Sequence, residues 1–350
     1  MVRPISVAGR GIGPGYPCFV VAEAGVNHNG EPEKTFRLVD AAVRAGADAV
    51  KFQTFTAEQL ATRDAPKAGY QAEVTGSGES QFEMLRRLEL SAEAHRELLA
   101  YSRQHGILFM STPFGEDSAD LLDELGIAVF KIPSGEITNL PFLTHVARKG
   151  KPMIISTGMA TLGEVETAMG VVRDAGARDL VLLHCVSNYP ARPSDVNLRA
   201  METMAAVFEV PVGYSDHTAG MEVALAAVAL GACVLEKHVT LDRSLPGPDH
   251  RASLEPAEFA ALVTGIRTVE GALGNGCKEP AASEAEMAAV ARKSLVAARH
   301  IPAGSKLTEE MLAAKRPGTG LPPAMRSQLL GRVVSRDIPA GTLLTLDMIA

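Results

Sequence analysis

The sequence predicts an α/β protein in which a (β/α)8 TIM barrel is followed by a small β-rich domain. Between residues 18 and 240, short runs rich in Val, Ile, Leu and Phe alternate with longer segments of helical periodicity. After about residue 289 this pattern stops, and an IPAG motif occurs twice in a short tail. Strands that alternate with helices indicate βα units and a parallel sheet, and eight such units fit a closed barrel.

The expected strands are eight apolar runs. They span residues 18–25, 49–55, 107–114, 128–136, 152–158, 180–187, 210–218 and 233–240. Segments 33–46, 92–106 and 117–126 have apolar residues at helical spacing and end on glycine, as helix C-termini often do. An open doubly wound sheet is the alternative, but it normally carries a G-x-G-x-x-G loop after its first strand. The sequence there is GVNHNG, which favours the barrel.

One interval between strands is longer than the others. Residues 56–90 follow the carboxyl end of the second expected strand, where barrels place their substrate loops. We interpret this insertion as a lid or wall of the site. A solvent-exposed insertion is the alternative.

The tail forms a domain of its own. We place the barrel at residues 1–276, a linker rich in small residues at 277–289, and the tail domain at 290–350. The two IPAG motifs are each followed by Leu-Thr and a short helix start, which predicts a two-lobed β domain with pseudo-symmetry. Because so short a domain has a small core, we expect it to dock on another surface.

Composition excludes several classes of protein. The net charge of -7, the absence of Trp and an aromatic content of 5% argue against a nucleic-acid partner. No apolar run is long enough to span a bilayer, so we expect no membrane partner. The four cysteines have no C-x-x-C spacing, which is typical of reduced thiols in a cytoplasmic protein.

Polar side chains follow every expected strand. They are Glu23, Asn27 and His28; Lys51 and Gln53; Thr112; Lys131, Ser134 and Glu136; Ser156 and Thr157; His184, Asn188 and Tyr189; Ser215 and His217; and Glu236, Lys237 and His238. Burying so many polar groups without partners would cost about 1–3 kcal/mol each. We therefore expect a wet, ligand-filled barrel mouth. Lysines among hydroxyl groups suit an anionic ligand, phosphate above all.

The consecutive residues Ser215, Asp216 and His217 do not indicate a serine hydrolase. Their side chains alternate between faces of a strand, so they cannot form a relay, and no G-x-S-x-G motif is present. His217 and His238 instead end adjacent strands about 4.8 Å apart, so both imidazoles can reach one ion. Nitrogen and oxygen donors without Cys fit Mn, Fe, Co, Mg or Zn acting as a Lewis acid. Asp249 follows Gly-Pro on a loop; it either points into the mouth or forms an Asx-turn or helix cap.

Together these motifs resemble the N-acetylneuraminate (sialic acid) synthase family. They are AEAGVNHNG, AVKFQT, STPF, KIPSGE, STGM, HC followed by YP, GYSDHT, LEKH, and PGPDH with SLEP, in order at all eight strand ends. The tail, with its IPAG repeats and KRPG, resembles that family's C-terminal antifreeze-like (SAF) domain. The resemblance implies condensation of phosphoenolpyruvate (PEP) with an N-acylated mannosamine-type sugar, which yields phosphate and a nine-carbon 2-keto acid.

The resemblance also implies roles for individual residues. Those matched to PEP binding are Lys51, Gln53, Thr112, Lys131, Ser156 and Ser215, and those matched to the sugar are Ser134, Glu136, Asn188, Tyr189, Asp249 and Arg316. His217 and His238 match catalytic metal ligands, with Mn²⁺ expected and Mg²⁺ or Co²⁺ as alternatives. Glu23 matches a catalytic position near the metal and the attacking water, and either Glu23 or a metal-bound hydroxide activates that water. Arg316 matches an arginine that reaches into the partner's barrel, which predicts a domain-swapped homodimer.

The expected acceptor is N-acetylmannosamine, which would make the protein an N-acetylneuraminate synthase. The alternative is a legionaminic acid synthase that uses 2,4-diacetamido-2,4,6-trideoxymannose, and no residue decides between them. Phe52 and Phe55 stand near Gln53 where some family members have His, so this flank is less polar here. Two rival classes are a synthase or aldolase for a phosphorylated sugar, which needs a second basic cluster at the mouth, and a carbohydrate- or ice-binding protein that uses the tail.

Overall fold

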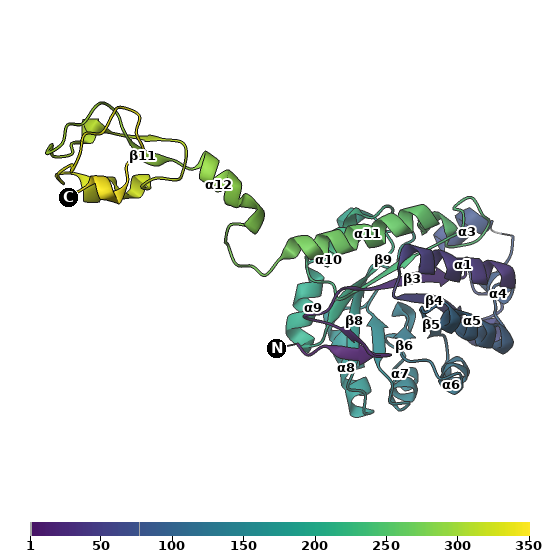
Figure 1. The fold of residues 1–350 in the computed structure, drawn as a ribbon. Helices are drawn as coiled ribbons and strands as arrows, with labels where there is room; N and C mark the ends of the chain where they lie inside the picture. Colours follow the sequence, from purple (N-terminus) through teal and green to yellow (C-terminus); the bar gives the residue numbers. More distant parts are fainter. Residues whose placement is uncertain (1, 77) are drawn as a thin grey trace. The chain divides into compact units, whose positions relative to one another are not determined.

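The computed structural model describes residues 2–76 and 78–350, which form two units (Figure 1). The first unit runs to Gly274, and the second runs from Asn275 to Ala350. The first is a closed βα barrel, and the second is a small domain with a two-stranded antiparallel sheet. This architecture confirms the predicted fold class.

Eight parallel strands build the barrel. They are β3 (Phe19–Gly25), β4 (Ala49–Thr54), β5 (Leu108–Pro113), β6 (Phe130–Ile132), β7 (Met153–Ser156), β8 (Leu180–Cys185), β9 (Val212–Asp216) and β10 (Val234–His238). The hydrogen-bonded order is β5-β4-β3-β10-β9-β8-β7-β6, so the first and last strands of the barrel are neighbours. Strands β5 and β6 contact each other at the remaining seam. The sheet therefore closes on itself, which excludes the open doubly wound alternative.

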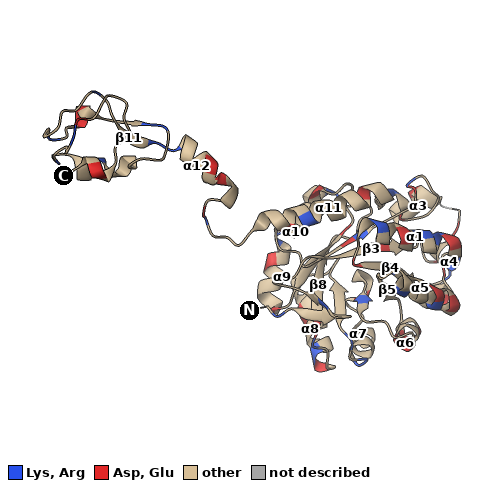
Figure 2. Ribbon diagram, viewed as in Figure 1, with Lys and Arg blue, Asp and Glu red and all other residues tan. Residues whose placement is uncertain are grey.

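Helices connect successive strands and cover the outside of the barrel (Figure 1). The longer ones are α1 (Pro32–Ala45), α5 (Ala92–Gln104), α6 (Glu116–Glu124), α7 (Leu140–Ala147), α8 (Leu162–Asp174), α9 (Ala200–Phe208), α10 (Glu222–Ala229) and α11 (Pro256–Leu273). Local sequence explains their ends: α1 starts with a proline and stops at Gly46, whose φ of 78° suits the left-handed C-cap. Their apolar faces pack on the sheet and form the main core. Acidic and basic residues are interspersed on the helices (Figure 2).

A second apolar core fills the barrel interior at the amino ends of the strands. A hairpin of β1 (Ile5–Val7) and β2 (Arg10–Ile12) contributes Val7 and Ile12 to it. These two side chains are fully buried and cluster with Phe19, Val21 and other early residues of the strands. Because this end is filled with apolar side chains, the polar residues are confined to the carboxyl end.

The insertion at residues 56–90, called the lid segment below, contains α2 (Ala57–Leu60), α3 (Gly69–Thr75) and α4 (Gln81–Arg86). Glu79 holds it together by accepting bonds from Lys67, at 2.8 Å, and from both terminal nitrogens of Arg87. The segment lines the central cavity, which supports its interpretation as a wall of the site rather than an exposed insertion.

The second unit contains the repeat that the sequence predicts. Strand β11 (Ser294–Ala297) pairs antiparallel with β12 (Leu312–Lys315), and the equivalent residues Ile301 and Ile338 of the two IPAG motifs pair with each other. Each repeat ends in a 3-10 turn, η5 (Glu309–Met311) or η7 (Leu346–Met348). The remaining helices of this unit are the short α12 (Ala285–Ala291) and α13 (Arg326–Leu329), and α12 overlaps the predicted linker. The second unit has an apolar core of its own, separate from the cores of the barrel.

Among the described residues, no helix combines the length and the apolar composition needed to cross a bilayer.

Candidate active site

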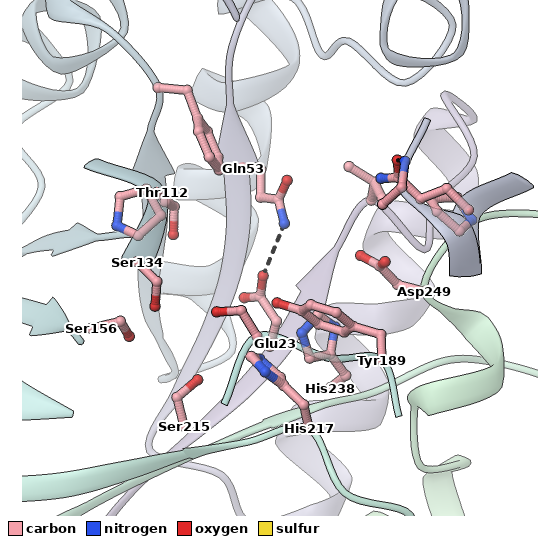
Figure 3. A pocket seen from close by; sticks show the side chains of 18 of the residues that line it. Glu23, Gln53, Thr112, Ser134, Ser156, Tyr189, Ser215, His217, His238 and Asp249 are labelled. Atoms are coloured by element: carbon pink, nitrogen blue, oxygen red, sulfur yellow. Dashed lines mark hydrogen bonds between the residues drawn. The ribbon is translucent and has the colours of Figure 1, made fainter. Parts of the chain in front are cut away.

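A cavity of about 440 Å³ lies at the carboxyl ends of the barrel strands. Most of the residues that the sequence analysis selected line it, and Figure 3 shows ten of them around one central space. The selected residues that line the cavity include Glu23, Lys51, Gln53, Thr112, Lys131, Ser134, Ser156, Tyr189, Ser215, His217, His238 and Asp249. The structure therefore brings together side chains from all eight strands or from the loops that follow them.

Two lysines and two carboxylates form the charged floor of this cavity. Lys51 Nζ lies 2.8 Å from Glu23 Oε2, donates to Thr112 Oγ1 at 2.8 Å and lies 3.7 Å from Glu236 Oε2. Lys131 Nζ lies 3.5 Å from the other oxygen of Glu236, which therefore bridges the two ammonium groups. All four charged side chains are almost fully buried. Such pairing is what permits charges to persist away from water.

The charges on this floor are set by burial and by the mutual contacts. Burial raises the pKa of Glu23 to about 7, although Lys51 opposes the rise. Burial also disfavours ionised Glu236, but Lys131 and Lys51 outweigh it and lower its pKa to about 2. For Lys51 the two carboxylates overcome burial and raise the pKa, whereas burial lowers the pKa of Lys131. The charge of Lys131 is thus less fully balanced by carboxylates than that of Lys51, which suits a site that receives an anion.

Hydroxyl and amide donors surround Lys131. Its Nζ donates to Ser156 Oγ at 2.7 Å, and the backbone N–H of Gly158 donates to Ser134 Oγ at 2.9 Å. A Cβ at Gly158 would lie 2.3 Å from Ser187 Oγ and 2.7 Å from Ser134 Oγ, so only glycine fits between these hydroxyls. An ammonium group with several hydroxyl groups nearby is suited to a phosphate or carboxylate.

The two histidines meet in the cavity as the sequence predicts. Their ring centroids are 5.3 Å apart, and the Tyr189 ring packs 4.1 Å from that of His217. The carbonyl of Val186 accepts a bond from His217 Nδ1 at 2.8 Å, which leaves Nε2 of that ring available. His238 Nδ1 is buried and has no hydrogen-bond partner. A divalent ion could bind these nitrogens, but the described residues contain no group of three or more His, Cys, Asp or Glu side chains placed to hold one, so the metal stays a prediction.

Strand alternation explains the sequence Ser215-Asp216-His217. Ser215 and His217 line the cavity, and Ser215 Oγ donates to Glu236 at 3.0 Å. Asp216 faces the other side, where its Oδ2 accepts from Lys237 Nζ at 2.7 Å, and both side chains are completely buried. Lys237 therefore serves a structural ion pair and does not contribute to the second basic cluster that a synthase for a phosphorylated sugar would need.

Asp249 belongs to the cavity wall and does not cap a helix. It precedes the 3-10 turn η3 (His250–Ala252) without a side-chain capping bond, and it is 7% exposed. Burial raises its pKa to about 6, against the influence of His217 and Lys51. In Figure 3, Asp249 and Thr112 lie on opposite sides of the space below Gln53, whose Nε2 donates to Glu23 Oε1 at 3.3 Å.

Two predicted sugar contacts, Glu136 and Asn188, lie outside the cavity lining of the described residues, and a third, Arg316, belongs to the second unit. Glu136 is in the 3-10 turn η1 (Ser134–Glu136) and accepts from Asn139 Nδ2 at 2.7 Å. Asn188 is exposed, and Arg316, in the second unit, donates from Nε to the carbonyl of Ala291 at 3.0 Å. Their roles stay predictions.

Several lining residues had no assigned role in the sequence analysis. Glu236 was noticed only as a strand-end residue, although its two-residue spacing from His238 places both on one face of β10. Tyr70 comes from the lid segment, and its ring stacks on Tyr189 with centroids 5.1 Å apart. Cys185 lies with its sulfur 3.7 Å from His217 Nδ1. No motif in the lid segment marks Tyr70 as a site residue.

Comparison with known proteins gives two family matches. The NeuB family matches residues 38–278, and the SAF domain matches residues 292–350. An N,N'-diacetyllegionaminic acid synthase of Campylobacter jejuni is 48% identical over 320 residues, covering 91% of this chain and 96% of that protein. One of Legionella pneumophila is 49% identical over 336 residues, covering 95% of this chain and 94% of that protein.

A solved structure is similar as well. The N-acetylneuraminic acid synthetase of Leptospira borgpetersenii, crystallised with citrate, matches with a TM-score of 0.73 and 37% identity. The match covers 82% of this chain and 95% of that one. The similarity therefore extends over most of the length of these relatives.

Proposed function

The chain belongs to the NeuB family of sialic-acid-type synthases, and we propose that it condenses PEP with 2,4-diacetamido-2,4,6-trideoxymannose. The products are N,N'-diacetyllegionaminic acid and phosphate. The observation that carries this proposal is the charged floor of Lys51, Lys131, Glu23 and Glu236 beneath two histidines in one cavity. That arrangement offers cationic donors for PEP beside a site for an aldehyde.

The choice of acceptor rests on the relatives. The sequence analysis favoured N-acetylmannosamine and kept the diacetamido sugar as the alternative. Two legionaminic acid synthases are 48% and 49% identical to the chain, whereas the N-acetylneuraminic acid synthetase structure is 37% identical. The comparisons therefore support the diacetamido sugar as the acceptor better than they support N-acetylmannosamine.

The cationic side of the cavity binds PEP in this proposal. Lys131 with Ser156 receives one anionic group of PEP, and Lys51 with Thr112 receives the other. These donors are fixed by their own hydrogen bonds before PEP arrives. They therefore need little reorganisation as charge develops on the departing phosphate.

A divalent metal would be held by His217 and His238, and when bound it would make the acceptor aldehyde more electrophilic as a Lewis acid. Tyr189 packs against both rings and limits how far they can turn. Mn²⁺ is the ion that we propose because the resemblance to the sialic acid synthase family implies it; the donor set by itself also suits Fe, Co, Mg or Zn.

The bonds change in the following order. C3 of PEP forms a bond to C1 of the open-chain acceptor, whose aldehyde oxygen takes up a proton. Water then adds at C2, and the bond between C2 and the phosphate oxygen breaks. Glu23 lies beside Lys51 and Gln53 with a pKa of about 7, so it can hold or release the proton of that water near neutral pH.

Phosphate release tests the proposed reaction. Purified protein with Mn²⁺, PEP and the diacetamido sugar should release one phosphate for each keto acid formed. In water enriched in ¹⁸O, the phosphate should stay unlabelled because the C–O bond breaks. No keto acid in folded protein, or label in the phosphate, would contradict the reaction.

We also propose a homodimer in which Arg316 reaches the partner's sugar. Arg316 is exposed on a loop of the SAF domain, where its Nε donates to the carbonyl of Ala291, and its terminal nitrogens are the groups that would act in trans. Mixing Arg316→Ala protein with Lys131→Met protein should restore activity above that of either variant alone. Mixtures no more active than their components would argue against action in trans.

A further inference from the structure

The lid segment gives the cavity an apolar wall. Leu60, Met84, Leu85 and Leu88 line the cavity there, together with Val26 and Phe114 from loops of the barrel. Val26, Phe55, Met84 and Leu88 are buried and form an apolar cluster apart from the two barrel cores. The wall is therefore packed from behind and keeps a defined surface toward the ligand.

Two of the polar side chains of the lid segment that line the cavity, Gln71 and Gln81, are bonded to each other. Gln71 Oε1 accepts from the backbone N–H of Ala68 at 3.0 Å and from Gln81 Nε2 at 3.3 Å. Tyr70 stacks on Tyr189. Apolar side chains outnumber these polar ones in the lining that the lid segment contributes, so this side of the cavity offers mainly apolar contact surface.

The charged floor and the apolar wall suit different substrates. PEP occupies the lysine side in the proposed function, on which this inference rests. Carbon C1 of the acceptor must meet C3 of PEP, so C6, at the other end of the sugar, points away from the lysines. We propose that the wall formed by Leu60, Met84, Leu85 and Leu88 receives the C6 end of the acceptor and selects a methyl group over a hydroxymethyl group.

The size of this selection follows from burial. A hydroxyl group that enters an apolar wall loses its water and gains no partner. Apolar pockets discriminate against an added hydroxyl by up to about 100-fold. We therefore expect a preference of about 10- to 100-fold in kcat/KM for the 6-deoxy acceptor.

Two acceptors that differ only at C6 isolate this effect. They are N-acetylmannosamine and its 6-deoxy analogue, each assayed for phosphate release at saturating PEP. The variant is Leu85→Gln, because Leu85 is only partly buried and the change should preserve folding. The matched control is Leu90→Gln, which makes the same change at the end of the same segment, outside the cavity lining.

Leu85→Gln should reduce the preference for the 6-deoxy acceptor at least fivefold and leave the KM for PEP unchanged, whereas Leu90→Gln should retain the wild-type preference. Equal kcat/KM values for the two acceptors in the wild type, or the same preference in Leu85→Gln as in the wild type, would overturn the inference and leave the proposed reaction standing. No turnover with these sugars or with the diacetamido sugar would overturn both.

Discussion

Replacing Lys131 with methionine should weaken the use of PEP far more than it weakens the fold. Methionine keeps the length of the side chain and removes its charge. Lys131 Nζ donates to Ser156 Oγ at 2.7 Å and to the carbonyl of Ile132 at 3.4 Å, and its nearest carboxylate oxygen is 3.5 Å away. An ammonium has three donors, so this cation keeps bonding capacity for a ligand.

The magnitude follows from Coulomb's law. Two unit charges about 4 Å apart interact by about 4 kcal/mol at an effective dielectric constant of about 20. Glu236 offsets part of this attraction, so we expect a loss of about 2–4 kcal/mol of PEP binding in the transition state. That loss corresponds to about 30- to 700-fold in kcat/KM for PEP.

Initial rates of phosphate release at varied PEP and fixed acceptor measure this effect. Lys151→Met is the matched control, because Lys151 is partly exposed and pairs with Asp123 outside the cavity lining. An exposed pair contributes about 0–1 kcal/mol, so this variant should keep its KM for PEP. A fall of less than threefold in kcat/KM for folded Lys131→Met would refute the assignment of this lysine to PEP.

Three further changes test other parts of the site. His217→Ala should lose bound Mn²⁺, measured by metal analysis of dialysed protein, while its circular dichroism stays native; metal bound as in the wild type would contradict the two-histidine site. Gly25→Ala should lower the free energy of unfolding, measured in urea, by about 1–2 kcal/mol, because Gly25 has a φ of +52°, where alanine is strained. It should also lower kcat, since the new methyl would lie 3.1 Å from Glu23 Oε1; an unchanged kcat would count against a precise position for that carboxylate. Glu79→Gln should speed hydrogen exchange in the lid segment by about two- to fivefold, because the ion pairs of Glu79 stabilise the closed segment by about 0.4–1 kcal/mol. Unchanged exchange would show that the lid does not depend on Glu79.

The same network gives the lid a pH dependence. Hydrogen bonds from Arg87, together with Lys67, lower the pKa of Glu79 to about 2. A carboxylate whose pKa is depressed in the folded state stabilises that state above its unfolded pKa of about 4.3. The contribution is lost as the pH falls from there toward 2. Lid exchange in the wild type should therefore approach that of Glu79→Gln in this range.

The barrel and its polar mouth could be predicted because both follow from short-range rules. Apolar runs that alternate with helical patterns fixed the strands, and the carboxyl-end rule then collected residues such as Lys131 and His217. Period-two alternation would also have separated Glu236, on the cavity face, from Lys237, on the other. The two side chains point to opposite faces although both stand at the end of the same strand.

The lid segment shows what short-range rules cannot supply. Tyr70 enters the cavity through tertiary packing of short helices, and nothing in its local sequence marks it. Glu136 shows the converse case: it lies in a 3-10 turn, accepts from Asn139 and is not among the lining residues, so its sugar contact stays a prediction. Positions on loops depend on how the loop packs, so they need the structure.

The most direct test of the proposed function is a competition between the two acceptors. Equal concentrations of 2,4-diacetamido-2,4,6-trideoxymannose and N-acetylmannosamine would share one pool of enzyme, Mn²⁺ and limiting PEP. Mass spectrometry would then give the ratio of the two keto acids, which equals the ratio of their kcat/KM values. We predict an excess of N,N'-diacetyllegionaminic acid of at least tenfold. An excess of N-acetylneuraminate would contradict the proposed acceptor and restore the reading that the sequence analysis preferred.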